Sequence, residues 1–581
     1  MYSDNKNEQA SRTMTSTAQP HWSIFLLTIG FLMLVSGLGC MFLFASIPGP
    51  DDPPAVAARE AAIGKIAFGI ALFGGLMFIG GGLVSAWRVT MLAAKRLFTL
   101  VLVFALGALG HGAVSAAEKP HIIFVMADDM GWGQTGYQNH PVLKTPNLDA
   151  MATGGLRFNR FYAGGPVCSP TRASVLTGRS HDRTGVLSHG HALRLQERTI
   201  AQALKDAGYV TGHFGKWHLN GHRGPGAPIF ADDPRSPDKF GFDEWVSVSN
   251  FFDLNPLMSR AGKFEELQGD SSEVAVAEAV KFLAKHHDNA KPTFTVIWFG
   301  SPHSPFKALD DDKEGFRDLN EASANHYGEL VAMDRSLGVL RSSLRSLGMA
   351  DNTLLVFCSD NGGLPGIKPE TVGGLRGNKG TVFEGGIRVP GVIEWPAVIK
   401  PRATNYPACV MDLFPTVAEI VGLPESVMTK PLDGISLKPL FDKELGERSS
   451  PIGFRYQAKR ALVTDRYKVL TGNLSGGKFE LYDLIADTKE SRDLSQEKPE
   501  IFASMKKQLL DWNASVDASF AGKDYAEGRL SPPDPEPVNW YDLPQYQPYL
   551  ADWKQRWEFK GYLNRAKGKA QRTGNGTRSG T

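Results

Sequence analysis

Strand-like and helix-like patterns alternate along the middle of the chain. Continuous apolar runs, typical of strands buried in a sheet, occupy residues 121–127, 209–214, 293–299 and 353–359. Helix-like patterns lie between them, including 199–208 and 322–348. This alternation predicts an α/β domain over residues 118–445, with a mostly parallel sheet flanked by helices.

The pattern changes after residue 445. Short strand-like segments, RALVTDRYKVL and KFELYDL, precede a helix-like segment from Glu500 to Trp512, which predicts a smaller α+β subdomain over 446–523. The tail, 524–581, carries several aromatic residues and ends in a basic, glycine-rich stretch. We expect the aromatic part to pack on the body and the last dozen residues to be disordered.

Three apolar runs occupy the first 118 residues. Residues 23–47 and 66–86 are each long enough to span a bilayer. The third run, 97–110, follows the basic segment MLAAKR and precedes HGAVSAAEKP. Residues 91–116 therefore have the layout of a secretory signal, with a cleavage site near Ala116, or form a third span.

Two interpretations of this region stay open. In the first, Met91 is the true start, and residues 1–90 are a misassigned extension or a fused membrane segment; the complete signal pattern favours it. In the second, three spans anchor the chain to the membrane, and the basic residues between the second and third spans stay cytoplasmic. Both predict an exported protein on the periplasmic or extracellular side, either secreted or membrane-anchored.

Composition and charge narrow the functional classes only slightly. The net charge of +2 gives no reason to expect a nucleic-acid partner. The four cysteines are too few for a disulfide scaffold, and no pair has the spacing of a metal-binding knuckle. Cys358 lies in an apolar run, where a small buried residue is expected.

Polar residues follow each of the four predicted strands. In chain order they are Asp128-Asp129, Lys216-Trp217-His218, His303 and Asp360-Asn361. Taken singly, such residues are more often turns, caps or surface groups. Their shared position matters, because ligands of open α/β sheets bind outside the carboxyl ends of the strands.

The carboxylates in this set suggest a hard cation. Oxygen donors from Asp128, Asp129, Asp360 and Asn361 suit Ca²⁺ or Mg²⁺ and fit zinc poorly. Adjacent aspartates repel each other unless a cation or a proton lies between them. The neighbouring motifs add three positive charges, on Arg172, Lys216 and Lys379. A metal beside fixed cations is a site for a compact polyanion such as sulfate or phosphate.

A lone cysteine precedes a predicted helix. Ser169 suits the N-cap, Pro170 suits the first helical position, and Gly178 can end the helix. Cys168 would then lie beside a helix N-terminus, which favours anions. It could be a thiol of low pKa in an anion site or a small residue filling a turn; position alone leaves both open.

The run Cys168-Ser-Pro-Thr-Arg172, followed by Leu176-Thr-Gly-Arg179, resembles the C-x-P-x-R…L-T-G-R signature of type I, formylglycine-dependent sulfatases. Other segments agree with this arylsulfatase-like family: ADDMGWG, TPNLDAMATGGLRFNRFY, GKWHL, PHSPF, SDNGG, GNKGTVFEGGIRVP and ELYDLIADTKE. The resemblance covers residues 120–515 approximately. It implies the alkaline-phosphatase-like fold, a mixed and mostly parallel sheet, with a C-terminal domain carrying a four-stranded antiparallel sheet.

In that family a maturation enzyme oxidises the signature cysteine to Cα-formylglycine before the chain folds. The resemblance implies that Cys168 becomes this aldehyde, and that one hydroxyl of its hydrate attacks the sulfur of a sulfate monoester. The alcohol leaves, and the second hydroxyl expels sulfate as the aldehyde re-forms. The implied partners are this maturation enzyme and a sulfated small molecule or glycan.

The family's residue roles map onto matching positions here. The implied ligands of one Ca²⁺ are Asp128, Asp129, Cys168, Asp360 and Asn361. The implied catalytic set is Cys168 as nucleophile, Arg172 holding its diol, Lys216 and Lys379 on sulfate oxygens, His303 as acid and His218 as base. His189 lies in a region that faces the substrate in relatives, so we expect it to contact substrate.

Two departures from the family pattern are small. Met130 replaces the usual Leu, and Asn220 is inserted before the Gly that normally follows the Lys-Trp-His-Leu run. Two other functions compete: a phosphonate monoester or phosphodiester hydrolase of the same superfamily, and an inactive membrane-tethered binding protein. The first tends to have Asp-Gln where this chain has Asp128-Asp129, and the second should have lost part of the residue set, so a sulfatase is favoured.

Overall fold

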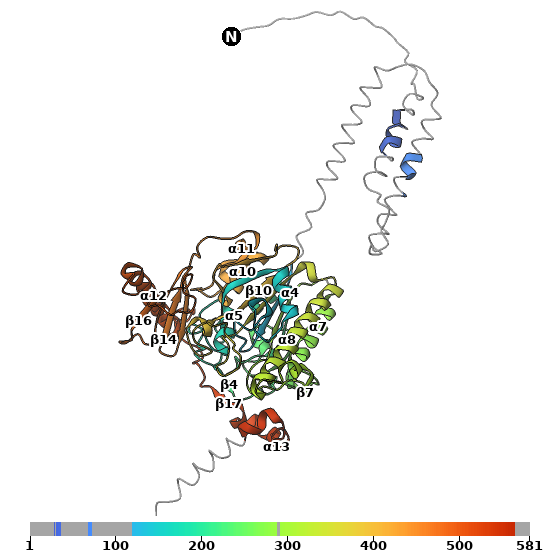
Figure 1. The fold of residues 1–581 in the computed structure, drawn as a ribbon. Coiled ribbons are helices and arrows are strands. Elements are labelled where there is room, and N and C mark those ends of the chain that lie inside the picture. The colour runs from blue at the N-terminus through green and yellow to red at the C-terminus, as the bar shows by residue number, and fades with distance from the viewer. Residues whose placement is uncertain are drawn as a thin grey trace, which may run out of the picture. The chain divides into compact units, whose positions relative to one another are not determined.

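The computed structural model describes residues 28–29, 31–36, 65, 68–72, 119–287 and 291–563. The chain divides into two units, residues 1–117 and 118–581 (Figure 1). In the first unit the described residues are helical, and the predicted spans 23–47 and 66–86 lie largely outside them; the signal-like segment 91–116 lies wholly outside. No helix within the described ranges is long and apolar enough to cross a membrane.

A mixed sheet forms the centre of the second unit. Its main strand order is β11-β2-β10-β9-β1-β8-β3-β5-β6-β7, and β12 also pairs with β2. The strands are β1 (His121–Ala127), β2 (Leu156–Tyr162), β3 (Val210–Lys216), β5 (Glu244–Val248), β6 (Leu257–Arg260), β7 (Lys263–Glu266), β8 (Thr293–Trp298), β9 (Thr353–Ser359), β10 (Arg388–Glu394), β11 (Arg402–Thr404) and β12 (Ala408–Cys409).

The four strands predicted from apolar runs are neighbours at the centre of this sheet. β1 pairs in parallel with β8 and β9, and β8 pairs in parallel with β3. β10 runs antiparallel to β2 and β9, which makes the sheet mixed. The predicted α/β class with a mostly parallel sheet is therefore confirmed.

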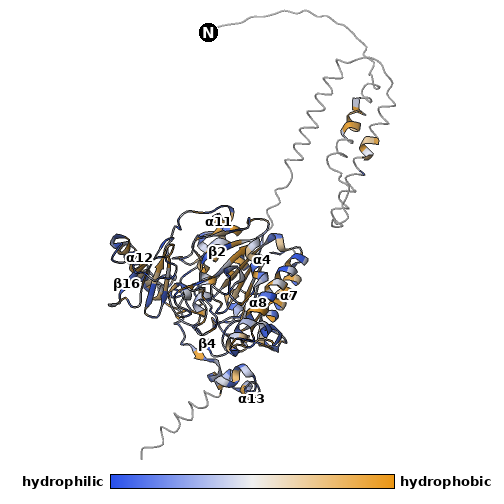
Figure 2. Ribbon diagram, viewed as in Figure 1, coloured by the Kyte–Doolittle hydropathy of each residue, from blue (hydrophilic) through white to orange (hydrophobic). Residues whose placement is uncertain are grey.

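Helices cover both faces of the sheet (Figure 1). They are α4 (Pro146–Gly154), α5 (Cys168–Thr177), α6 (Ile200–Asp206), α7 (Ser271–His287), α8 (Glu321–Ser346), α9 (Glu384–Ile387), α10 (Leu413–Val421) and α11 (Lys438–Asp442). The central strands are mainly hydrophobic, whereas α7 and α8 present polar residues on part of their surface (Figure 2).

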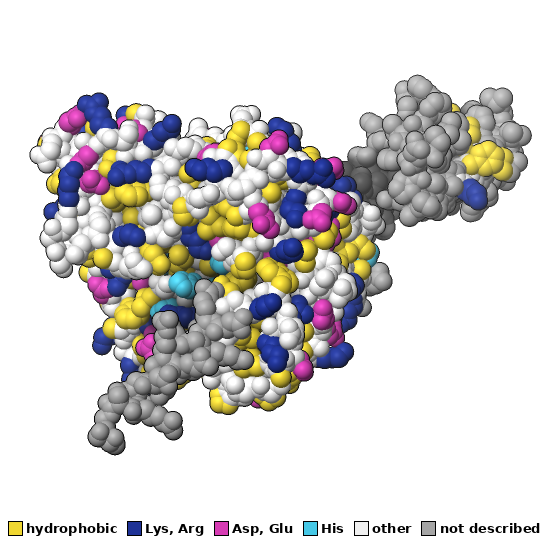
Figure 3. Space-filling view, turned by 60° about the horizontal axis from the view of Figure 1, so that its bottom comes forward, with side chains coloured by type: hydrophobic (Ala, Val, Ile, Leu, Met, Phe, Trp, Pro, Cys, Tyr) yellow, Lys and Arg dark blue, Asp and Glu magenta, His cyan; other side chains and the backbone are white. Residues whose placement is uncertain are grey.

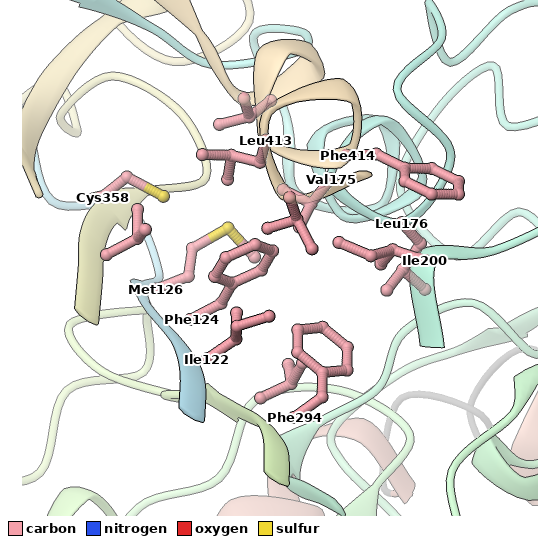
Figure 4. Close-up of a cluster of buried hydrophobic side chains, with 14 of the residues drawn as sticks. Ile122, Phe124, Met126, Val175, Leu176, Ile200, Phe294, Cys358, Leu413 and Phe414 are labelled. Carbon is pink, nitrogen blue, oxygen red and sulfur yellow. The ribbon is translucent and has the colours of Figure 1, made fainter. Parts of the chain in front are cut away.

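Residues of β1 alternate between the two hydrophobic cores, as strand geometry requires. Phe124 packs edge-to-face on Phe294, with ring centroids 5.3 Å apart, in the core that also contains Val175 and Phe414 (Figure 4). Ile123, by contrast, belongs to the core under α7 and α8. A strand buried on both faces has no polar alternation, which is why its sequence is a continuous apolar run.

The C-terminal subdomain contains the expected four-stranded antiparallel sheet. Its strands are β13 (Ile452–Tyr456), β14 (Lys459–Val463), β15 (Tyr467–Thr471) and β16 (Phe479–Asp483), paired in that order. Helix α12 (Pro499–Phe520) contacts β14 and β15. The predicted helix from Glu500 to Trp512 is therefore present but extends eight residues further.

The aromatic part of the tail packs on the body, as expected. Strand β17 (Val538–Asn539) pairs in parallel with β4 (His222–Arg223), and Trp540 and Tyr546 are fully buried beside Ala227. A short helix, α13 (Leu550–Trp553), follows. Residues 564–581, where a disordered end was expected, lie outside the described residues.

A buried cation joins the subdomain to the main domain. Lys468 of β15 lies 3.1 Å from Glu384 of α9 and 2.8 Å from Glu490, and all three side chains are fully buried. Glu384 also accepts a hydrogen bond from the Tyr162 hydroxyl, at 3.0 Å. The Lys468 ammonium group therefore compensates two buried carboxylates, with Arg388 adding a second positive charge 3.7 Å from Glu384.

Replacing Lys468 with Met should lower the free energy of unfolding by about 3–5 kcal/mol, because buried Glu490 loses its counter-charge and Glu384 keeps only the more distant Arg388. Thermal and urea unfolding would measure the loss. Lys478→Met is the matched control: Lys478 pairs with Asp493 at 2.7 Å but is 68% exposed, so its loss should change stability far less. Equal effects of the two substitutions would contradict this account.

Candidate active site

The four predicted strand ends meet at one edge of the sheet. β9, β1, β8 and β3 are consecutive in the strand order, so the residues after them converge. The register places Ala127 opposite Ser359, and the Asp360 amide donates to the Ala127 carbonyl at 3.1 Å. Asp128 and Asp360 therefore begin adjacent loops, as the sequence predicts.

Asp128 is held between two cations. Its Oδ2 accepts a hydrogen bond from Lys216 Nζ and lies 3.6 Å from Arg172 Nη2. Burial alone would raise the pKa of Asp128, but attraction to Lys216, His303 and Arg172 outweighs it and holds the pKa well below its ordinary value. Asp128 is therefore a buried carboxylate.

Asp129 ties the remaining strand-end residues together. Its backbone has a left-handed φ of 71°, and its amide donates to Asp360 Oδ1 at 3.0 Å. Its carboxylate accepts hydrogen bonds from Asn361 Nδ2 at 2.8 Å and Lys379 Nζ at 2.7 Å. A left-handed aspartate persists where its surroundings fix it, and here hydrogen bonds to three other residues do so.

The donor set fits a divalent cation. Asp128, Asp129, Cys168 and His303 offer ligand atoms that all lie within 4.8 Å of one another. The buried Oδ1 atoms of Asp128 and Asn361 have no hydrogen-bond partner among the described residues. Burial and the neighbouring Asp128 raise the pKa of Asp360 to about 7, the sign of carboxylates crowded without enough positive charge. A cation bound to these oxygens would neutralise the excess negative charge of the carboxylates.

Cys168 is the first residue of α5, and every residue of this helix is buried. The predicted N-cap at Ser169 and first helical residue at Pro170 are wrong by two residues: Val167 is the N-cap, and Ser169 Oγ instead accepts the Gly190 amide at 2.9 Å. The predicted end is correct, because Gly178 is left-handed with φ 70°. Burial raises the pKa of the Cys168 thiol to about 11, so the low-pKa thiol hypothesis is wrong.

Arg172 lies one helical turn after Cys168. Its guanidinium donates to Asp360 Oδ2 at 2.9 Å and to the Lys216 carbonyl at 3.0 Å. It also lies over the Trp298 ring, 5.1 Å from the ring centroid. These contacts fix a fully buried cation between three of the four strand ends.

His303 faces the same group of carboxylates. Its Nδ1 donates to the Ser304 carbonyl at 2.5 Å, and its Nε2 lies 3.8 Å from Asp129 Oδ2. Its ring stacks on Phe251, with centroids 4.8 Å apart and planes 8° apart. Burial and the nearby Lys379 lower the pKa of His303 to about 4.

His218 and His189 differ in their surroundings. His218 is 2% exposed, has a left-handed φ of 55°, and neither ring nitrogen has a partner within the described part of the chain. Burial and Lys216 lower its pKa far below the ordinary value. His189 is exposed at its surface, and partial desolvation of its ring, together with the nearby Lys379 and Arg223, lowers its pKa. Figure 3 shows a few histidine side chains near the centre of the face drawn, with lysine and arginine side chains scattered across it.

Comparison with known proteins identifies the family. The sulfatase family model matches residues 120–423, and the model of the N-sulphoglucosamine sulphohydrolase C-terminal region matches residues 377–515. The chain belongs to the sulfatase family. The N-acetylgalactosamine-6-sulfatase of Canis lupus familiaris is 34% identical over 58% of this chain and 69% of that protein. Bovine arylsulfatase A is 32% identical over 68% of this chain and 80% of its own.

Solved structures agree with this assignment. The complex of Ps i-CgsB with k-i-k-neocarrahexaose has a TM-score of 0.61 and 25% identity, covering 76% of this sulfatase and 99% of that chain. The phosphonate monoester hydrolase of Agrobacterium radiobacter shares the fold at a TM-score of 0.51 and 20% identity, covering 68% of this sulfatase and 96% of that chain. The alkaline-phosphatase-like fold and the assignment as a sulfuric ester hydrolase are thus confirmed.

The structure brings the predicted strand-end residues of this sulfatase, with Cys168, Arg172 and Lys379, to the same edge of the sheet, although their individual roles stay predictions. Sequence reasoning missed two neighbours. Trp298, under Arg172, lies inside an apolar run that indicates only a strand. Phe251 follows β5, a strand without a distinctive sequence pattern, and its contact with His303 joins segments 52 residues apart.

Phe251 positions the imidazole of His303, so Phe251→Ala should lower kcat/KM for a sulfate ester about two- to tenfold, the value of one stacked pair. Phe251→Tyr keeps the ring and should retain activity. Phe479→Ala, in the C-terminal sheet, controls for general loss of packing and should leave kcat/KM unchanged. Full activity of the alanine variant at Phe251 would show that the stacking does not orient His303.

Proposed function

We propose that this sulfatase releases sulfate from a sulfated carbohydrate, using a formylglycine made from Cys168 and one bound Ca²⁺. The observation that carries the proposal is the meeting of Asp128, Asp129, Cys168 and His303 within 4.8 Å, beside three buried or half-buried cations. Hard oxygen donors, a compact anion site and the family's cysteine signature coincide at this point.

Formylglycine hydrate would supply a hydroxyl that attacks sulfur and a second hydroxyl that releases the enzyme-bound sulfate. Calcium would neutralise the sulfate oxygens and would be held by Asp128, Asp129, Asp360, Asn361 and the modified residue 168. The net reaction converts a sulfate monoester and water to an alcohol and hydrogen sulfate, which loses its proton in water.

The protein's own residues surround this chemistry from three sides. Lys216 and Lys379 each already bind a site carboxylate, so their ammonium groups are positioned to hold sulfate oxygens. Arg172, fixed by Asp360 and the Lys216 carbonyl, holds the nucleophile's oxygens. The cations replace water around an anion that would otherwise be costly to bury.

Two histidines divide the proton transfers. His303 donates from Nδ1 to the Ser304 carbonyl, so Nε2 is the nitrogen on the site side and, in its protonated form, would give a proton to the leaving alcohol. Asp360 would accept the proton of the attacking hydroxyl. His218, buried with both ring nitrogens free of partners in the described chain, accepts the proton of the second hydroxyl.

The substrate class follows the relatives. The N-acetylgalactosamine-6-sulfatase and the neocarrahexaose-bound structure both concern carbohydrates. The exposed side chain of His189, which feels the charge of Lys379, supports the proposal that it contacts such a substrate. A phosphonate or phosphodiester substrate is less favoured, because the similarity to the phosphonate monoester hydrolase extends to the fold alone. An inactive binding protein is disfavoured by the complete set of site residues.

The remaining parts of the proposal concern the maturation of the protein and its location in the cell. A maturation enzyme would oxidise Cys168, and the catalytic part would lie outside the cytoplasmic membrane. The signal-like segment 91–116 supports export, and the apolar runs at 23–47 and 66–86 support a membrane anchor.

Cys168→Ala should abolish hydrolysis of an aryl sulfate, since no other group supplies the nucleophile. Cys409→Ala is the matched control: Cys409 is also fully buried but is not one of the candidate ligand residues, and its variant should stay active. Peptide mass spectrometry should show residue 168 lighter than cysteine. Full activity of the Cys168→Ala variant, or a faster wild-type rate with an aryl phosphonate, would overturn the proposal.

Removing divalent metal with a chelator should inactivate the enzyme and lower its melting temperature, because crowded carboxylates lose their counter-ion. Ca²⁺ at a hundred times its Kd should restore about 2.7 kcal/mol of stability. Asp129→Asn should blunt this response, while Asp511→Asn, on the exposed side of α12, should not. A melting temperature indifferent to Ca²⁺ would contradict the calcium site.

A further inference from the structure

A pocket of about 460 Å³ lies between the segment after β3 and the C-terminal tail. Asn220, His222, Asp233 and Arg235 line one side, and the tail supplies the other with Glu536, Val538, Leu543 and Gln545. This volume falls within the range of about 300–1,000 Å³ usual for small-molecule sites. The two family matches end at 423 and 515, so the tail wall lies outside both.

Short chain segments and packing contacts link the pocket wall to the active site. Asn220 follows His218 by two residues. The Gly190 amide donates to Ser169, the neighbour of Cys168, and a Cβ at Gly190 would lie only 2.7 Å from Cγ of Arg223. Arg223 belongs to β4, the strand that pairs with β17 of the tail. Closely packed segments therefore connect residue 168 to the pocket wall.

Asn220 presents an unused acceptor. Its Nδ2 donates to Asp233 Oδ2 at 2.9 Å and to His222 Nδ1 at 3.0 Å, which fixes the orientation of the amide. Asn220 is 6% exposed, and its Oδ1 has no partner within the described ranges. A buried carbonyl oxygen without a partner is costly unless a ligand or water donates to it.

Arg235 presents a donor to the same pocket. Its backbone is anchored, because the amide donates to Asp233 and the carbonyl accepts from Trp217 Nε1 at 2.8 Å. Its buried Nε finds no acceptor among the residues described. An acceptor and a donor on one wall match neighbouring hydroxyl groups, each of which can donate and accept.

The charge of the pocket excludes a second sulfate as its preferred ligand. Asp232, Asp233 and Glu536 line it, against the guanidinium of Arg235. Three carboxylates repel an anion but accept hydrogen bonds from hydroxyl groups. Val538 and Leu543 of the tail add apolar surface, which suits the C–H face of a sugar ring.

We propose that this pocket binds an unsulfated sugar unit next to the sulfated one, so that the tail makes the enzyme prefer an oligosaccharide. The inference rests on the proposed function, since it assigns a second subsite to the same substrate. Asn220 and Arg235 would bind adjacent hydroxyl groups of that unit. The inserted Asn220 and the tail would thus both serve to bind the neighbouring sugar unit.

The test compares three substrates: an aryl sulfate, N-acetylgalactosamine 6-sulfate, and a trisaccharide ending in that sugar. The wild type should prefer the trisaccharide. Arg235→Met should lower kcat/KM for the trisaccharide about tenfold, the loss of one charge-assisted hydrogen bond, and leave the aryl sulfate unchanged. Gln545 is exposed, so Gln545→Ala should spare the fold and should also lower kcat/KM for the trisaccharide.

Gln547→Ala is the matched control, because Gln547 lies on the same short helix (Pro544–Tyr549) but does not line the pocket. It should leave all three rates alone. Equal losses on aryl sulfate and trisaccharide, or no preference of the wild type for the trisaccharide, would overturn the subsite.

A binding measurement separates this inference from the proposed function. The desulfated trisaccharide should bind the wild type in ligand-observed NMR and bind Arg235→Met more weakly, whether or not the sample turns over sulfate esters. No hydrolysis of any sulfate ester, together with retained sugar binding, would defeat the proposed mechanism and keep the subsite. Hydrolysis of sulfate esters without binding of the desulfated trisaccharide would keep the proposed mechanism and defeat the subsite.

Discussion

Balancing buried charge is the constraint on which this active site depends. Asp128, Asp129 and Asp360 are fully buried at adjacent strand ends, where their mutual repulsion is strong. Arg172 and Lys216 compensate part of it from within, with side chains as buried as the acids. Burial and the neighbouring Asp128 still raise the pKa of Asp360, and the cation proposed for this site would offset that cost.

Much of the fold and most of the site could be predicted because both depend on local sequence. Strands buried on two faces are continuous apolar runs, and the residues after parallel strands must meet at one edge. Asp128, Lys216, His303 and Asp360 are found together on that reasoning alone. The family signature around Cys168 then adds the chemistry that spacing cannot supply.

What escaped prediction depends on contacts between distant segments. The thiol of Cys168 has a raised pKa because the folded chain excludes water from it, and burial outweighs the nearby helix N-terminus. The stacking of Phe251 on His303 needs a loop whose strand carries no strong pattern. The tail is anchored by Arg194, which binds Asp534 through two hydrogen bonds across 340 residues.

The complete burial of α5 has a consequence for the fraction of molecules that become active. Under the proposed maturation, an enzyme that oxidises residue 168 would reach it only before folding, because folding encloses the thiol. Oxidation and folding would then compete, and each molecule would keep the result for its lifetime. Specific activity would record the relative speeds of the two processes during synthesis, so two preparations of one sequence could differ in active fraction while melting at nearly the same temperature.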